Sequence, residues 1–341
     1  MQDVARHPGF TRLFAPGKLT IGLILPLETH PRRPRPTMQG HVEMAQQADA
    51  LGFGALWVRD IPFYEPAYGD VGQVFEPLAY AAHLAAKTRV IALGTAGIVL
   101  PLREPLLLAK QVATVDLLSG GRFVLGVSSG DRPSDYPLFG IDAEERGERL
   151  REVFGVYRAV AEHSFPTFQS EHFGRAQGQL DLVPKPPFGS TPTLAVGRAQ
   201  QALEWIAANM HGFMAYAPLA EGLPLLAQEW SSQVSEVAAG PLRPLAVGGF
   251  LDLVPDAHHP VVRIPGGLRA GVRSLVQYLD SAQHSGIQHF AMNLRVSERP
   301  YMELMMELSE HVLPRFPSHT MADPYPGIER HLRPVPAAES A

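Results

Sequence analysis

The chain has 341 residues and a mass of 37.2 kDa, with 45% hydrophobic and 18% charged residues, which excludes intrinsic disorder. A net charge of −5 gives no basic footprint for nucleic acid, and the lack of cysteine excludes disulfides, thiol catalysis and iron–sulfur clusters. The longest nearly apolar run, residues 90–102, is too short to span a bilayer, and the first residues contain no apolar signal segment. We therefore expect a soluble, cytoplasmic protein with no membrane partner.

Short apolar runs alternate with helical patterns along the chain. The first strand, residues 19–25, precedes a helix over residues 38–51, whose apolar positions recur every three or four residues. Further strands are predicted at residues 55–58, 90–94, 122–127, 193–196, 212–216, 245–253 and 287–294. Further helices are predicted at residues 75–86, from Pro105 to Gly120, after a capping box at Asp142 and Glu145, and at residues 199–210, 220–237, 268–284 and 301–313.

Eight strand–helix units predict an α/β fold, a (β/α)₈ TIM barrel, because doubly wound open sheets, the alternative, usually have about five or six units. Residues 164–190 predict an insertion after the fourth helix, in the form of a hairpin, and residues 254–265 a second insertion after the seventh strand. We expect one barrel domain over residues 19–316, an N-terminal extension over residues 1–18 and a C-terminal tail over residues 317–341.

Common cofactor and metal motifs are absent. The nearest match to the dinucleotide fingerprint, at Gly52 and Gly54, follows a helix and has Trp57 in place of the third glycine. The adjacent His258 and His259 are interpreted as loop residues, so no metal site is expected.

One segment matches the G-x-S-x-G nucleophile elbow of α/β-hydrolases, with Ser128 as the nucleophile. The elbow requires a helix directly after the serine, and Pro133 and Pro137 disfavour one. A serine hydrolase stays as an alternative with low support.

Small and hydroxyl residues mark the predicted strand ends, where barrels carry their sites. They leave room for a flat ligand against the backbone, although they could equally serve only the packing of strand ends. The residues are Asp60 after the second strand, Thr95, Ala96 and Gly97 after the third, and Ser128, Ser129 and Gly130 after the fourth.

A second feature of this kind follows the fifth strand, where Gly197, Arg198, Ala199 and Gln200 are predicted to open a helix. Free N–H groups and the helix dipole favour a phosphate there, with Arg198 as a counter-charge. An ordinary helix start with a solvated arginine is the alternative.

Three segments resemble the bacterial luciferase-like flavin-dependent monooxygenase family: ADALGFGALWVRD, TRVIALGTAGIVLPLREPLLLAKQVATVDLLSGGRFVLGVSSG and LAVGRAQQALEWIAANMHGFMAY. The segment GDRPSDYPLFGIDAEERGERLREVF resembles a luciferase-type oxidoreductase subgroup. The resemblance covers about residues 19–316. It implies a (β/α)₈ barrel that holds FMN, or the deazaflavin F420, at the carboxyl ends of its strands.

The resemblance also places the parts of the cofactor. It implies a flavin ring near Asp60, Thr95, Ala96, Ser128, Ser129 and Gly130, and a phosphate at Gly197, Arg198, Ala199 and Gln200. Relatives often have a non-prolyl cis peptide just after the third strand, which corresponds here to Ala96–Gly97.

The usual chemistry of the family is the reaction of reduced FMN with O₂ and transfer of one oxygen atom to an organic substrate. For this chain we expect a small, largely apolar one. The resemblance implies a separate NAD(P)H:flavin reductase and a homodimer. The alternatives are F420-dependent hydride transfer on the same barrel and a flavin-binding protein without catalysis.

The chain departs from its relatives after the second strand, where many have a histidine and this sequence has Asp60-Ile61-Pro62. The acid/base residue is therefore unassigned, with Asp60 and Arg132 as catalytic candidates. Aromatic residues of the loop over residues 63–75, and Phe165, Phe168 and Phe173, could form a lid or only pack outside the barrel. Predicted substrate contacts are Phe63, Tyr64, Asn293 and Arg295.

Overall fold

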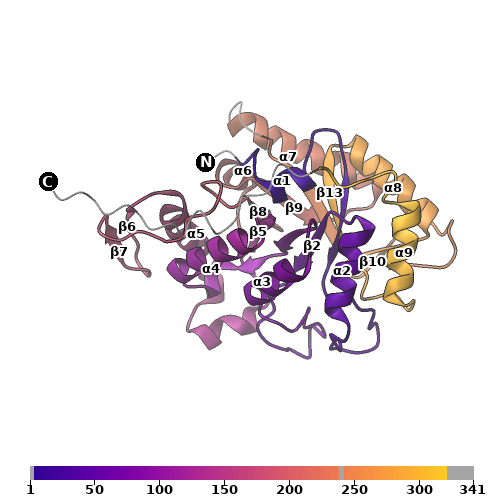
Figure 1. Cartoon of the computed structure of the whole chain (residues 1–341), viewed down its shortest axis with the longest axis horizontal. Helices are drawn as coiled ribbons and strands as arrows, with labels where there is room; N and C mark the ends of the chain where they lie inside the picture. Colours follow the sequence, from indigo (N-terminus) through magenta and orange to yellow (C-terminus); the bar gives the residue numbers. More distant parts are fainter. Residues whose placement is uncertain (1–3, 238–241, 321–341) are drawn as a thin grey trace.

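The computed structural model describes residues 4–237 and 242–320 and contains a closed barrel of parallel strands (Figure 1). Each strand pairs with the next in chain order, and the last returns to the first, with Thr20 opposite His289. The predicted (β/α)₈ barrel is confirmed, and the alternative prediction of an open, doubly wound sheet is wrong. The barrel strands are β1 (Thr20–Ile24), β2 (Ala55–Val58), β3 (Ala92–Thr95), β5 (Phe123–Ser128), β8 (Thr193–Val196), β9 (Gly212–Tyr216), β10 (Leu245–Leu253) and β13 (Ile287–Asn293).

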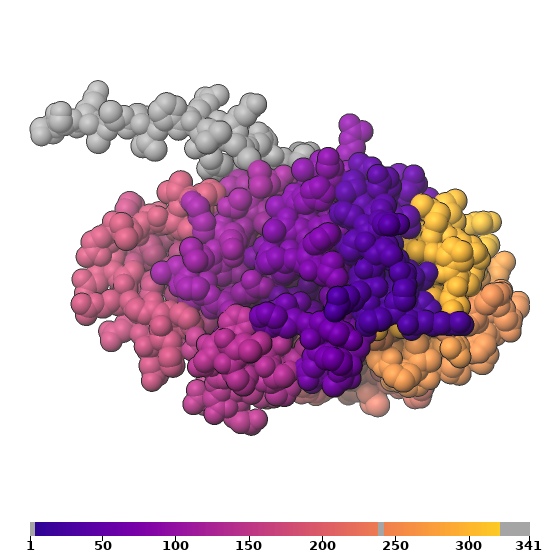
Figure 2. Space-filling model, turned by 90° about the horizontal axis from the view of Figure 1, so that it is seen from below, coloured from indigo at the N-terminus to yellow at the C-terminus, as the bar shows by residue number. Residues whose placement is uncertain are grey.

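Helices surround the barrel, one after each strand. The first and last of them, α2 and α9, contact each other, so the two ends of the barrel meet in space, and Figure 2 shows the indigo and yellow segments side by side. None of the helices in the described part of the chain is both long and apolar enough to cross a membrane. The helices are α2 (His41–Leu51), α3 (Pro77–Lys87), α4 (Pro105–Leu118), α5 (Arg146–Glu162), α6 (Leu203–Asn209), α7 (Leu223–Val237), α8 (Val272–His284) and α9 (Tyr301–His311).

Local sequence explains where α4 begins and ends. Pro105 occupies its first turn, and the Glu104 side chain accepts a hydrogen bond from the Leu107 N–H. Gly120 follows it with a φ of 70°, a conformation that glycine adopts without a steric penalty. Between these signals, Leu108 and Val112 pack on the barrel.

The barrel interior is filled by large and small residues that fit one another. The Trp57 ring lies against Gly94, where an added Cβ would overlap the ring. The Trp57 Nε1–H donates to His289 Nε2 over 2.9 Å, and Thr20 Oγ1 lies 2.7 Å from His289 Nδ1 and donates to the Leu13 carbonyl. Burial lowers the pKa of His289 to about 3, so its ring is neutral and accepts from Trp57.

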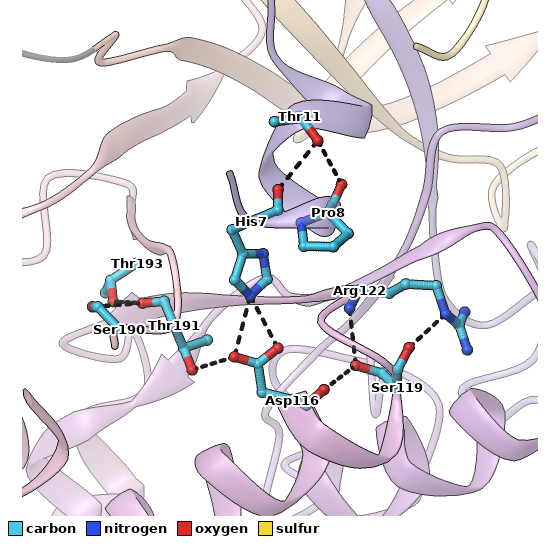
Figure 3. Close-up of polar contacts among 9 residues, drawn as sticks. All are labelled: His7, Pro8, Thr11, Asp116, Ser119, Arg122, Ser190, Thr191 and Thr193. Carbon is cyan, nitrogen blue, oxygen red and sulfur yellow. Dashed lines mark hydrogen bonds and ion pairs between the residues drawn. The ribbon is translucent and has the colours of Figure 1, made fainter. Parts of the chain in front are cut away.

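A helix in the predicted N-terminal extension, α1 (Pro8–Leu13), closes the end of the barrel at which its strands begin, and its Phe10 and Leu13 are buried. We call this end the floor of the barrel. His7 Nε2 lies 3.0 Å from Asp116 Oδ1, and Thr191 donates to Asp116 Oδ2 over 2.7 Å (Figure 3). His7 and Asp116 are both fully buried, which ties α1 to α4.

The insertions differ from expectation in one respect. The first contains the predicted hairpin, β6 (Thr167–Gln169) with β7 (Arg175–Gln177). The second is not irregular to its end, because β11 (Val262–Ile264) and β12 (Gly267–Ala270) extend the sheet from β10, so α8 begins four residues later than predicted. Gly267 pairs with Phe250 and lies so close to its backbone that no side chain fits there.

Two further expectations concern chain ends and caps. The Asp142 side chain accepts from the Glu144 N–H and caps a 3₁₀ turn before α5, instead of forming a box with Glu145. Of the predicted tail, residues 321–341 lie outside the described residues, as do residues 1–3 of the predicted extension.

Candidate functional site

A cavity of 710 Å³ opens at the carboxyl ends of the barrel strands. This is the face where TIM barrels bind ligands, and the volume lies within the usual range for small-molecule sites. Segments that follow β2, β3, β5, β8 and β13, together with the middle of β10, line it. Ile24, Val196 and Met214 contribute apolar surface.

One wall of the cavity is close-packed backbone. The Ala96–Gly97 peptide is cis, as the resemblance implied, and both residues line the cavity. Thr95 Oγ1 donates to the Gly126 carbonyl and accepts from its N–H, and a Cβ on Gly126 would lie 1.8 Å from the Thr95 carbonyl oxygen. Only glycine therefore fits at position 126. The result is a wall without bulky side chains, against which a flat ring fits.

The end of β5 continues this wall. Ser128 Oγ donates to the Gly97 carbonyl over 3.3 Å, and the buried Tyr136 hydroxyl donates to the Ser129 carbonyl. Burial raises the pKa of Tyr136 to about 12, so the hydroxyl keeps its proton. A 3₁₀ helix (Pro133–Phe139) follows in place of the helix that a nucleophile elbow requires. No histidine is among the described residues that line the cavity, so Ser128 has no base there and the hydrolase interpretation loses its support.

Asp60 is held by protein partners. Its carboxylate accepts from the Val99 N–H over 2.9 Å and from Arg103 over 2.7 Å, and its side chain is 2% exposed. Burial alone would lower the pKa of Arg103, but Asp60 and Glu76 outweigh it and raise that pKa. Both oxygens of Asp60 are thus engaged, which suits a residue that positions the loop after β3 better than one that transfers protons.

The segment after β8 is a turn and not the predicted helix start. Ala199 and Gln200 have φ values of 50° and 58°, so α6 begins only at Leu203 and the predicted start at Ala199 is wrong. The N–H groups of residues 198–200 donate to no described residue, whereas the Arg198 side chain pairs with Glu229 over 2.6 Å. Successive N–H groups in such a turn form a concave anion site.

The opposite side of the cavity is basic. Arg59 forms an ion pair with Asp70, Arg295 Nε lies 3.8 Å from the same carboxylate, and Arg132 donates to the Asp70 carbonyl over 2.8 Å. Burial alone would raise the pKa of Asp70, but Arg59 and Arg295 outweigh it and lower that pKa. Burial also lowers the pKa of Arg295. We call Arg59, Asp70, Arg132 and Arg295 the basic corner; all four line the cavity.

The structure brings most of the predicted site residues together, but not all. Thr95 is fully buried behind the wall, and Phe63 and Tyr64 are exposed and do not line the cavity. Asn293 lines the cavity and accepts from the Arg295 N–H. The residues that line the cavity as predicted are Asp60, Ala96, Ser128, Ser129, Gly130, Arg132, Gly197, Arg198, Ala199, Gln200, Asn293 and Arg295.

The cavity residues that the sequence analysis missed include the ion pair of Arg59 and Asp70. Arg59 directly follows β2 and could have been found by the same strand-end argument that selected Asp60. Asp70 lies eleven residues further along a loop, at a distance at which the sequence carries no signal.

The structure is thus a (β/α)₈ barrel with a cavity at the carboxyl ends of its strands. The sequence model of the family described as luciferase-like monooxygenase matches residues 19–248, more than half of the chain, and the chain belongs to this family. A 4-hydroxyprotoasukamycin monooxygenase of Streptomyces nodosus subsp. asukaensis is 29% identical over 231 residues, which cover 65% of this chain and 60% of the relative. The match thus spans less than two thirds of that relative's length.

Solved structures share the fold. A monooxygenase from Streptomyces bottropensis superimposes with a TM-score of 0.68 and 19% identity, covering 86% of this chain and 99% of its own. An F420-dependent secondary alcohol dehydrogenase does so with a TM-score of 0.70 and 18% identity, covering 86% and 98%. At these identities the likeness concerns the barrel alone.

Proposed function

We propose that the protein is a monooxygenase that binds reduced FMN in the cavity and uses O₂ to oxidise a small organic substrate. The observation that carries the proposal is the pairing of a bare backbone wall at Ala96–Gly97 with the turn over residues 198–200, whose N–H groups have no acceptor among the described residues. When bound, the flavin supplies the redox chemistry, which side chains alone do not provide. The chain supplies binding, orientation and exclusion of water.

Specific residues have distinct tasks in this proposal. The N–H groups of residues 198–200 hold the phosphate, and Ala96, Gly97, Ser128, Ser129 and Gly130 flank the ring. Asp60 positions the loop after β3 through Val99 and Arg103. A separate NAD(P)H:flavin reductase would supply the reduced cofactor, and the homodimer implied by the resemblance belongs to the same proposal.

The test compares FMN with riboflavin, which lacks the phosphate. In anaerobic fluorescence titrations with the reduced forms, we expect FMN to bind at least about 100-fold more tightly than riboflavin, because a set of charge-assisted hydrogen bonds contributes several kcal/mol. Equal affinities, or no binding of either, would contradict the proposal. F420 is measured in the same anaerobic titration, and O₂ consumption is measured in a separate aerobic assay. Tight F420 binding without O₂ consumption would favour hydride transfer instead.

A further inference from the structure

We propose that the basic corner binds a carboxylate of the substrate, so that the preferred substrates are small organic acids with an apolar body. This inference rests on the proposed function and deepens it, because it assigns a substrate class to the same cavity. It replaces the expectation of a largely apolar substrate.

Arg295 is the first reason. Its side chain is 13% exposed, yet it donates no hydrogen bond to any described residue, and its buried Nε has an ion pair with Asp70 but no hydrogen-bond partner. Its nearest protein groups are Asp70 at 3.8 Å and the Phe250 ring, 5.2 Å from the guanidinium carbon. Burying a charge without hydrogen-bond partners is costly, and buried polar groups in proteins are nearly always satisfied. An acceptor on a ligand in the cavity would supply the missing partners.

Charge is the second reason. The basic corner holds three guanidinium groups and one carboxylate, and that carboxylate already accepts from Arg59 and from the Gly72 N–H. Arg132 donates only to the carbonyls of Phe63 and Asp70 and stacks on Tyr68, so its charge is not neutralised by an ion pair. Asp131 lines the cavity without an ion pair and buried Asp135 interacts electrostatically with Arg132, so both offset charge on Arg132, whereas Arg295 shares Asp70 with Arg59. A carboxylate fits the planar fork of a guanidinium.

Topology is the third reason. Arg59 follows β2 and Arg295 follows β13, the two strands that pair with β1. The turn over residues 198–200 follows β8, which lies on the opposite side of the barrel from β1. An anion at the basic corner therefore does not compete with a phosphate at the turn. Between them, Ile24, Met214 and Phe250 offer apolar surface to the rest of the substrate.

The experiment measures binding of matched acids and amides to the FMN-loaded protein by calorimetry. The pairs are butyrate with butyramide, hexanoate with hexanamide, and phenylacetate with phenylacetamide. We expect at least one acid to bind at least tenfold more tightly than its amide. Arg295→Met should remove this preference, and Arg295→Lys should retain part of it, because the charge stays while the fork is lost. The control Arg32→Met removes an exposed guanidinium, paired with Glu298, that does not line the cavity.

The outcomes separate the inference from the proposed function. If no acid binds better than its amide, or if Arg295→Met leaves the preference intact, the inference is overturned. FMN affinity is measured alongside and should change less than threefold in Arg295→Met; a tenfold loss would assign the basic corner to the cofactor phosphate and also overturn it. If the wild-type protein binds no FMN, the proposed function fails first. Thermal unfolding of each variant shows whether it is folded.

Discussion

The floor of the barrel, at the amino ends of its strands, and the mouth, at their carboxyl ends, differ in how far their charged side chains are paired. At the floor, Asp116 accepts from Thr191 and lies against His7, and the Trp57 N–H finds an acceptor in His289. At the mouth, the Arg295 side chain and the N–H groups of residues 198–200 donate no hydrogen bond to any described residue. Water reaches the turn, since Arg198 and Gln200 are exposed, and a ligand in the cavity would offer acceptors to the turn and to Arg295.

This contrast gives different expectations for substitutions. A change at the floor should lower the free energy of unfolding and leave ligand affinity of the folded protein intact. A change in the groups that line the cavity should lower ligand affinity and leave the free energy of unfolding nearly unchanged. Residues that build the wall between the two regions, such as Gly126, should affect both.

The largest effect is expected for Gly126→Ala. The new Cβ would lie 1.8 Å from the Thr95 carbonyl oxygen, a backbone atom that cannot rotate away. We expect the free energy of unfolding to fall by about 3 kcal/mol, the upper end for overpacking, and FMN affinity to fall with it, because the displaced strand ends form the wall. Urea denaturation and an FMN titration measure the two quantities.

Gly155→Ala is the matched control. Gly155 lies exposed in α5, with nothing within 4 Å of an added Cβ, so the same substitution should raise stability by up to about 1 kcal/mol. If both substitutions changed the free energy of unfolding by the same amount, the backbone around Gly126 would be able to move and accommodate the new Cβ.

The next effect concerns the floor. Asp116→Ala leaves buried His7 and Thr191 without their acceptor, and we expect a loss of about 2–3 kcal/mol in the free energy of unfolding. FMN affinity of the folded protein should stay within twofold. Asp280→Ala, which removes an exposed ion pair with Arg315, should cost less than about 1 kcal/mol. If folded Asp116→Ala protein bound no FMN, the floor and the mouth of the barrel would not be energetically independent.

The sequence predicted the barrel because its signals are local. Pro105 and Gly120 bound α4 in the sequence as they do in space, and the alternation of strands and helices survives without any tertiary information. It did not predict β12, because Gly267–Ala270 is a strand only through pairing with β10. Nor did it predict the late start of α6, since the positive φ values of Ala199 and Gln200 are set by the turn around them.

A third effect depends on pH and tests the buried ring of the interior. The pKa of His289 falls from 6.5 to about 3 in the folded protein, so the unfolded chain binds one more proton between these values. Stability from this group is complete above pH 6.5 and is lost as the pH falls toward 3. At about 1.4 kcal/mol per pH unit, the loss between pH 6.5 and 5 is about 2 kcal/mol.

His289→Gln keeps an acceptor for Trp57 and does not titrate. The slope of unfolding free energy against pH, measured by urea denaturation from pH 7 to 5, should therefore become shallower by about one proton. An unchanged slope would mean that His289 takes up its proton in the folded barrel as it does in the unfolded chain.

Much of the candidate site was predictable because its residues end a strand or lie within two residues of a strand end. Asp60, Ala96, Ser128 and Asn293 were all selected by that rule, and all line the cavity. Phe63 and Tyr64 were selected by residue type alone, and their side chains face solvent. The ion pair of Arg59 with Asp70 depends on how a long loop folds back, which local patterns do not encode.

The smallest effect is expected at Arg198, which the sequence analysis predicted to be the counter-charge of the phosphate. In the structure its guanidinium is 57% exposed and pairs with Glu229, whereas the N–H groups of the turn are free to hold an anion. Arg198→Gln should therefore weaken FMN binding by no more than about threefold, or about 0.6 kcal/mol, in a fluorescence titration at physiological salt. A loss of tenfold or more would show that the side chain leaves Glu229 for the phosphate, and the two anion sites of the mouth would then both depend on arginine.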